Sequence, residues 1–396
     1  MHNYLLRVML VVQPVLWGCR PQSSSHDFPL DRTWQRVARS ENPGGDAPLA
    51  SQGGAAVYDG QRGRVMLFGG RDEQHNESNQ LWEFDLGRRQ WMEVQTEGLL
   101  SPPRFGHSLV LDSVNDSLVL FGGADPAPTA ETWTFDLRAN SWSNTTHNSA
   151  PSCANHTAIY DPRAKRMIVF GGKMVRDAAS QARPTNEAFA LNLDPQAAGF
   201  RTWELLRTSV EKPQPRRRHS AVYDSIRHRL LICGGSGPVS RWYFNDLWAL
   251  DLSSLRWSEV STQGELPHPF CNAVAALDRQ TDKLIVFGGS VSVTIEPGNT
   301  EQFLVNRVWV LDLKSLCWTD RTPHPRTVYD HSMVFIPDRD AAITYGGSSH
   351  RPVKEHDTWL LQSRSEIASP YVPMKITGNA GTGDAHVETD QFLDGQ

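Results

Sequence analysis

Residues 219–260 read HSAVYDSIRHRLLICGGSGPVSRWYFNDLWALDLSSLRWSEV and have the pattern of four short β-strands. The first strand, HSAVYD, leads into RLLIC, an almost wholly apolar run that ends at a Gly-Gly pair. Such a run, bounded by glycines, is typical of a strand buried on both faces. The third and fourth strands, DLWALDL and WSEV, are joined by a turn that begins at Asp251, a residue favoured at the first position of β-turns. The stretch therefore predicts a four-stranded antiparallel unit.

The same pattern occurs six times. Its diglycine ends at intervals of 49 to 63 residues, at Gly70, Gly123, Gly172, Gly235, Gly289 and Gly347. A third-strand aromatic residue recurs at Trp82, Trp133, Phe189, Trp248, Trp309 and Trp359, and a fourth-strand tryptophan at Trp91, Trp142, Trp203, Trp257 and Trp318. A period of about fifty residues is that of the kelch repeat. From Trp34 to about Leu361 the chain resembles the kelch-repeat β-propeller family, which includes the central domain of galactose oxidase-like proteins.

The repeats also predict how the propeller closes. The sixth repeat stops after its third strand at Leu361, whereas an unpaired fourth-strand tryptophan, Trp34, begins the chain's first copy of the pattern. We therefore expect an all-β, six-bladed kelch β-propeller over residues 33–363, closed by the N-terminal strand, because closure leaves no strand edge unpaired. Residues 364–396 lose the apolar pattern and are expected to form a disordered tail.

The N-terminus has the features of an export signal. Residues 1–18 combine Arg7 with the apolar run VMLVVQPVLWG, which is too short to span a membrane. Leu16 to Cys19 resembles a bacterial lipobox, which implies a lipid on Cys19, a tether over residues 19–32 and an extracytoplasmic protein, either a cell-envelope lipoprotein or a secreted one. An ordinary signal peptide or a wrongly assigned start codon are the alternatives.

Charge and cysteine content limit the classes of partner and ligand that we expect. The formal net charge of −5, with no Lys/Arg run longer than Arg216 to Arg218, argues against nucleic acid. Five cysteines without a CxxC motif do not indicate a metal site. Cys271 and Cys317 are expected three strands apart in one blade, beyond the roughly 7 Å that a disulfide allows. We expect free thiols, no cofactor, and a monomer that touches a membrane only through a lipid anchor.

Four repeats place a histidine at the start of the first strand: His107, His156, His219 and His331. First strands line the channel of a propeller, so four imidazole groups there suggest a transition-metal site. A second interpretation is that each histidine bonds to a neighbouring backbone. We favour the second, because a metal needs its ligands within about 2.1 Å.

Two arginines stand three residues before such a histidine, Arg104 in PRFGH and Arg216 in PRRRH. In kelch domains the matching arginine often points into the binding funnel, and Arg218 of the same run is a further candidate. A guanidinium group suits carboxylates and phosphates. The alternative is that each arginine pairs with an acidic residue of a neighbouring blade.

The loop after the fourth diglycine contains an aromatic pair, Trp242 and Tyr243, outside the repeat pattern. An exposed pair would stack on a sugar or anchor a peptide, whereas a folded-over loop would bury it. The predicted ligand-binding residues are Arg104, Arg216, Arg218, Trp242 and Tyr243.

Two functions fit these features. The first is a non-catalytic binding module that holds a protein or a glycan on its loop face. The second is a carbohydrate-active enzyme similar to the sialic-acid mutarotases, which implies an acid beside a funnel arginine. Candidate acids are Glu73, Glu77 and Glu301. Because no catalytic signature is present, we assign no catalytic residue and favour the binding module.

Overall fold

The computed structural model describes residues 33–38, 47–48, 52–124, 127–175, 181–239, 242–296, 299–321, 323–348 and 357–362. This part of the chain is all-β, with one short 3₁₀ turn at Pro337–Arg339. The signal segment, Cys19, the tether and the C-terminal tail lie outside the described residues.

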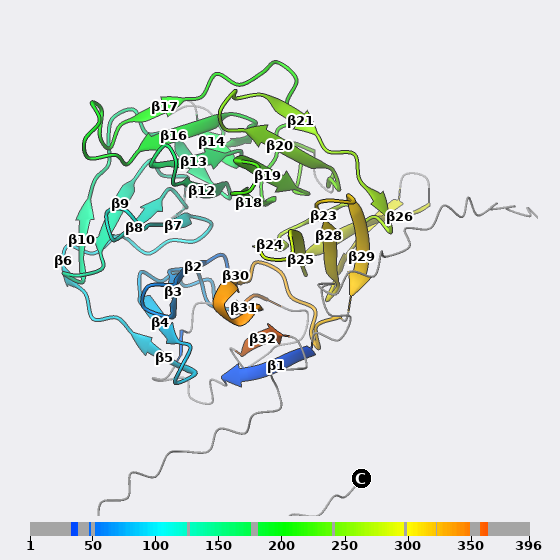
Figure 1. The fold of residues 1–396 in the computed structure, drawn as a ribbon, viewed down its shortest axis with the longest axis horizontal. Helices are drawn as coiled ribbons and strands as arrows, with labels where there is room; N and C mark the ends of the chain where they lie inside the picture. The colour runs from blue at the N-terminus through cyan, green and yellow to red at the C-terminus, as the bar shows by residue number, and fades with distance from the viewer. Residues whose placement is uncertain are drawn as a thin grey trace, which may run out of the picture.

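Six sheets each contain the four strands of one repeat. They are β2–β5 (Ala55–Asp59, Arg64–Phe68, Leu81–Asp85, Gln90–Glu93), β7–β10 (Ser108–Asp112, Ser117–Phe121, Thr132–Asp136, Ser141–Asn144), β12, β13, β16 and β17 (Thr157–Asp161, Arg166–Phe170, Ala188–Asn192, Trp203–Leu205), β18–β21 (Ser220–Asp224, Arg229–Cys233, Leu247–Asp251, Trp257–Glu259), β24, β25, β28 and β29 (Val274–Asp278, Lys283–Phe287, Val308–Asp312, Cys317–Arg321), and β30–β32 with β1 (Ser332–Ile336, Ala341–Tyr345, Thr358–Gln362, Thr33–Ala38). Figure 1 shows these sheets around a common centre, with each repeat's first strand nearest to it.

Shorter strands complete the topology. β6 (Glu97–Gly98) and β22 (Gln263–Gly264) pair in parallel with β10 and β29, outside two of the sheets. Two small sheets are built from the loops after the third and fifth diglycines: β11 (Ser152–Ala154), β14 (Lys173–Val175) and β15 (Arg183–Pro184), and β23 (Phe270–Cys271), β26 (Ser290–Glu296) and β27 (Asn299–Leu304).

Apolar side chains pack between adjacent sheets. The second strands are buried as their sequence predicts, and β8 and β25 are buried along their whole length. Six hydrophobic clusters lie one at each interface between neighbouring repeats. Between the first two repeats, for example, Phe68 packs in one cluster with Leu118 and Trp142. Each such side chain contributes about 1.5–3 kcal/mol when fully buried. Because the core is divided among the interfaces between repeats, its burial depends on a complete ring.

The N-terminal strand completes the last sheet. β1 pairs antiparallel with β32 and places Trp34 opposite Leu361, as the unpaired tryptophan predicts. The centre of the Trp34 ring lies 5.0 Å from the centre of the Phe287 ring in the preceding repeat. The first strand β2 packs against β30, so the six first strands follow one another without a gap. The first and last repeats are thus neighbours (Figure 1).

Three of the four histidines hydrogen-bond to the preceding repeat, and the fourth, His331, packs its ring against Phe287 of the preceding repeat. Nε2 of His107 is 3.1 Å from the Phe68 carbonyl oxygen, and Nε2 of His156 is 2.8 Å from Oγ of Ser108. Burial lowers the pKa of both imidazoles to about 3, so they stay neutral. Among the described residues, no three His, Cys, Asp or Glu side chains are grouped so as to hold a metal ion.

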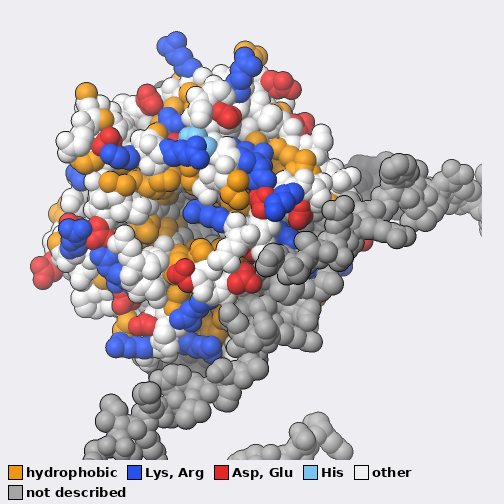
Figure 2. All heavy atoms as spheres, in the orientation of Figure 1, with side chains coloured by type: hydrophobic (Ala, Val, Ile, Leu, Met, Phe, Trp, Pro, Cys, Tyr) orange, Lys and Arg blue, Asp and Glu red, His pale blue; other side chains and the backbone are white. Residues whose placement is uncertain are grey.

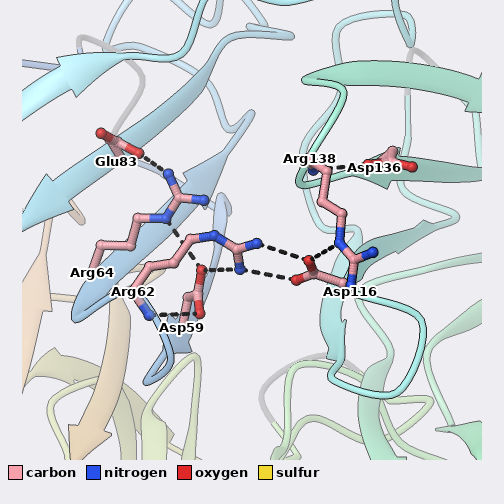
Figure 3. Close-up of polar contacts among 7 residues, drawn as sticks. All are labelled: Asp59, Arg62, Arg64, Glu83, Asp116, Asp136 and Arg138. Carbon is pink, nitrogen blue, oxygen red and sulfur yellow. Dashed lines mark hydrogen bonds and ion pairs between the residues drawn. The ribbon is translucent and has the colours of Figure 1, made fainter.

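Charged residues link the repeats at the turn between the first two strands of each sheet. Figure 3 shows Arg62 reaching from the β2–β3 turn to Asp116, which lies just before β8. Arg227 makes the same contact with Asp282 between the fourth and fifth repeats.

Three cysteines, Cys153, Cys233 and Cys271, are free and buried. Cys271 is therefore not paired with Cys317, but the expectation of free thiols is wrong for Cys317, which is disulfide-bonded. In the described part of the chain, no helix has the length and apolarity needed to cross a membrane.

Candidate functional site

A closed circle of backbone hydrogen bonds marks the end of the ring at which the first strands begin. The residue two positions before each first strand donates its N–H to the matching carbonyl of the preceding repeat, at 2.7–3.3 Å. All six have φ of 54–64°, in the left-handed region, a conformation most accessible to Gly, Asn and Asp. We call these six residues the mouth ring: Gly53, Gly106, Asn155, Arg218, Asn272 and Asp330.

A second layer of β-bridges surrounds the mouth ring. In each repeat the residue upstream of the mouth-ring position pairs with the residue that follows the diglycine. The pairs are Gln52–Arg71, Phe105–Ala124, Ala154–Lys173, Arg217–Ser236, Cys271–Ser290 and Tyr329–Ser348. This layer places Arg71 and Lys173 at the post-diglycine position and Arg217 at the upstream position, all three beside the ring.

The mouth therefore gathers four cations, namely Arg71, Lys173, Arg217 and Arg218, around Asp330, the single acidic residue of the mouth ring. Among the described residues, no hydrogen bond or ion pair involves the four cationic side chains. Nε of each of the three arginines is buried without a hydrogen-bond partner. A buried N–H group that lacks an acceptor is costly, so these groups favour an anionic ligand.

The charges of the mouth residues shift one another's pKa values. Burial lowers the pKa of Lys173, and the charges of Arg217 and Arg218 lower it further. Burial also raises the pKa of Asp330, although Arg218 and Arg71 oppose that rise. The cations thus repel one another with little compensation, which an acidic group of a ligand would relieve.

Tyr243 borders the mouth from the fourth repeat's loop. Its backbone pairs with Ser236, and its hydroxyl group lies against the side chains of Cys271 and Ser290. Burial raises the pKa of Tyr243 to about 12, so the hydroxyl remains a hydrogen-bond donor at neutral pH.

Arg104 and Arg216, predicted from the sequence to face the ligand, do not reach the mouth. The Arg216 side chain is fully buried, with two bonds to the Asp246 carboxylate at 2.6 and 2.7 Å and one to the Gly234 carbonyl at 2.9 Å. Arg104 is buried against Glu131 and the Gly122 carbonyl. Each arginine pairs with an acid of its own repeat, not with one of a neighbouring blade as the alternative interpretation expected, and its donors are used within the protein.

The other predicted residues lie toward the mouth. Arg218 belongs to the mouth ring, Tyr243 borders it, and the adjacent Trp242 is 52% exposed. Sequence reasoning missed Arg71, Lys173 and Arg217. The sequence feature that could have found two of them is their position, because Arg71 and Lys173 each follow a diglycine directly.

The acids proposed for an enzyme are arranged differently. Glu73 and Glu301 are exposed, and Glu77 pairs through its backbone with Arg71. The charges of Arg218 and Arg71 act instead on Asp330, which forms no hydrogen bond or ion pair with them among the described residues.

Comparisons with known proteins agree with this architecture. Over residues 15–196 and 106–347 the chain matches a family model described as the KLHDC2/KLHL20/DRC7 Kelch-repeats domain. Host cell factor of Drosophila melanogaster is 26% identical over 84% of this chain and 20% of its own length. Host cell factor 2 of Homo sapiens is 24% identical over 90% of this chain and 47% of its own length. The chain thus spans less than half of either protein.

Two further proteins are similar. Kelch domain-containing protein 3 of Homo sapiens is 25% identical over 64% of this chain and 66% of its own length. The structure of YjhT superposes with a TM-score of 0.62 and 12% identity, covering 81% of this chain and 97% of that chain. The second likeness concerns the fold alone.

Proposed function

Since this chain belongs to the kelch-repeat family, we propose that it is a non-catalytic binding module whose mouth holds an acidic segment of a partner protein. The observation that carries the proposal is the set of three buried, unpartnered Nε groups on Arg71, Arg217 and Arg218. A carboxylate accepts hydrogen bonds from guanidinium groups, often two at a time, and such charge-assisted bonds are roughly twice as strong as neutral ones. The mouth is therefore suited to carboxylates.

The rigid scaffold supports this role. The mouth ring fixes Arg218 by backbone bonds on both sides, to Asn155 and Asn272. A ligand then meets groups that are already ordered, so less conformational entropy is lost on binding. We further propose six blades, which the six sheets that each contain one repeat's four strands support, and a monomeric protein.

A nucleic-acid partner is not favoured. On the face in Figure 2, Lys and Arg side chains lie among Asp and Glu side chains instead of forming one basic band. A duplex needs a row of cations that follows its phosphates. A compact group of cations suits a short acidic segment better.

A carbohydrate-active enzyme of the sialic-acid mutarotase kind is the second candidate. The observation that favours it is Asp330, a carboxyl group with a raised pKa beside Arg71 and Arg218. Such a group suits proton transfer at a sugar whose carboxylate the arginines would hold. We favour the binding module because no hydrogen bond fixes the Asp330 carboxyl group for catalysis among the described residues.

Export with lipidation of Cys19 is also proposed, from Leu16 to Cys19. Expressed in a bacterium, the chain should incorporate labelled palmitate, and Cys19→Ser should abolish the label. Equal labelling of the two chains would contradict lipidation.

Binding of labelled peptides by the full chain tests the main function. We expect fluorescence polarisation to show that fluorescein-hexaglutamate binds more tightly than fluorescein-hexaglutamine, with affinity falling as salt rises. R217Q/R218Q should lower the affinity for hexaglutamate at least about tenfold. The control R88Q/R138Q removes the same charge at side chains that are 71% and 80% exposed, and should change the affinity less than about twofold.

Two results would overturn the proposal. The first is that hexaglutamate binds no more tightly than hexaglutamine. The second is that both double variants lose the same affinity for hexaglutamate. Conversion of sialic-acid anomers by the chain, followed by NMR and lost in Asp330→Asn, would favour the enzyme.

A further inference from the structure

The loop after the fourth diglycine presents two exposed apolar side chains beside the mouth. Trp242 is 52% exposed and Val239 is 59% exposed. Trp242 directly precedes Tyr243, whose electrostatic influence reaches Arg217 in the mouth. An exposed tryptophan adjacent to a desolvated charge cluster is typical of a binding hot spot. We call Trp242 and Val239 the aromatic ledge.

Backbone hydrogen bonds fix the ledge. The Trp242 N–H donates to the Val239 carbonyl at 3.2 Å, and the Gly237 N–H donates to the Trp242 carbonyl at 2.8 Å. The Phe244 N–H donates to the Gly235 carbonyl at 2.9 Å. The two apolar residues are thus held next to each other by the loop's own bonds, although both remain exposed.

A buried stack supports the ledge from below. The Arg216 guanidinium carbon lies 4.2 Å from the centre of the Phe244 ring, and the Phe244 and Trp242 rings are 6.0 Å apart. Asp246 fixes the other edge of the same guanidinium group with two hydrogen bonds. Because cation–π contacts strengthen when the groups are desolvated, Arg216 holds Phe244 in place under the tryptophan.

The second repeat shows that this stack is not required by the fold. Arg104 occupies the equivalent buried position and pairs with Glu131 as Arg216 pairs with Asp246. In the post-diglycine loop of the second repeat, Ala124 pairs with Pro128 as Ser236 pairs with Tyr243 in the fourth, and Thr129 pairs with Cys153 as Phe244 pairs with Phe270. The position that matches Phe244 is therefore a threonine and not an aromatic residue. The aromatic ledge is therefore an addition to the fourth repeat.

We propose that the aromatic ledge binds an apolar side chain of the partner, next to the carboxylate that the mouth holds. This inference rests on the proposed function. The partner is then an acidic protein segment with a large apolar residue beside its acid, and Arg216 is a positioning residue for the ledge. Charge at the mouth and apolar surface beside it match the two parts of such a segment.

A pair of peptides tests the ledge separately from the mouth. Fluorescein-labelled Glu-Glu-Leu-Glu-Glu-Glu should bind the full chain about tenfold more tightly than hexaglutamate, the gain expected from burying one leucine side chain. W242A should lose this gain and keep the affinity for hexaglutamate. I226A truncates a side chain that is 54% exposed in the β18–β19 turn. This variant should keep both the gain from leucine and the affinity for hexaglutamate.

Arg216 is tested against Arg104. R216M and R104M both remove a buried ion pair, so both should lower the melting temperature. Only R216M should reduce the gain from leucine, because only Arg216 supports the ledge. If R216M does not fold, Phe244→Leu removes the stacking partner and should reduce the gain in the same way.

The outcomes separate the two proposals. Equal binding of the two peptides, or a leucine gain that survives W242A, would overturn the ledge while leaving the mouth intact. Failure of both peptides to bind would overturn the proposed function and the ledge with it.

Discussion

The guanidinium group of Arg62 and the carboxylate of Asp116 form a two-point ion pair across the first two repeats, with N–O distances of 2.9 and 2.8 Å (Figure 3). Arg62 also contacts Asp59 of its own turn at 3.2 Å. One arginine thus ties the start of β3 to the neighbouring sheet at the ring face opposite the mouth, where packing of the strands alone would leave the turn free.

Arg62→Met should lower the free energy of unfolding at pH 7 by about 1 kcal/mol, because the pair is partly exposed to solvent. The pKa of Asp116 is lowered from 3.8 to about 2, chiefly by its hydrogen bonds with Arg62. A lowered pKa stabilises the fold above pH 3.8, and this contribution is lost as the pH falls toward 2. Urea unfolding from pH 7 to pH 2 should therefore show a smaller loss for Arg62→Met than for the wild type.

Arg88→Met is the control for this prediction. The Arg88 side chain is 71% exposed, so its removal should change the unfolding free energy by less than about 0.5 kcal/mol. An acid dependence of Arg62→Met identical to that of the wild type would contradict the assigned role of the ion pair.

Removal of the N-terminal strand should open the ring. β1 pairs with β32 along its length, and Trp34 packs with Leu361 and Phe287 in the interface between the fifth and sixth repeats. Deleting residues 20–39 exposes the β32 edge and this cluster, so the melting temperature should fall sharply. Differential scanning calorimetry measures the change, and an unchanged melting temperature would contradict closure by β1.

The repeat marks in the sequence determine strand positions well, because the apolar second strand and the diglycine reflect local packing that every repeat shares. They could not determine which arginine of the run from Arg216 to Arg218 faces a ligand. The ion pair with Asp246, which is 30 residues away in the sequence, holds the Arg216 side chain away from the mouth. Arg71 and Lys173 reach the mouth only because the repeats pack side by side around a common centre, and residues so far apart in the sequence share no local pattern that would show it.

Binding of an acidic ligand should be coupled to protonation of Asp330. Burial raises the pKa of Asp330, so its carboxyl group favours the neutral form more than in the unfolded chain. A ligand carboxylate in the mouth would raise that pKa further. Hexaglutamate affinity should therefore increase as the pH falls through the raised pKa, until the peptide's own carboxylates take up protons.

Asp330→Asn isolates this effect. The raised pKa means that stability is greatest below the unfolded value of 3.8 and is lost as the pH rises through the folded value. At pH 7 Asp330→Asn should thus be at least as stable as the wild type, and its hexaglutamate affinity should be higher and less dependent on pH. Calorimetry and polarisation at pH 5 to 8 measure both, and a parallel pH dependence in the two proteins would exclude Asp330 as the coupled group.

The last prediction concerns Gly122, whose missing side chain allows two repeats to meet. A Cβ atom there would lie 2.4 Å from the Cys153 carbonyl oxygen and 2.9 Å from Cε1 of His156. Gly63 has nearly the same φ, 61° against 65°, but a Cβ atom there would meet nothing within 4 Å. Gly63→Ala should cost about 1 kcal/mol from its backbone conformation alone. Gly122→Ala should cost about 3 kcal/mol more, since backbone must move to admit the methyl group. Equal costs in urea unfolding would show that the repeats do not meet through the diglycine.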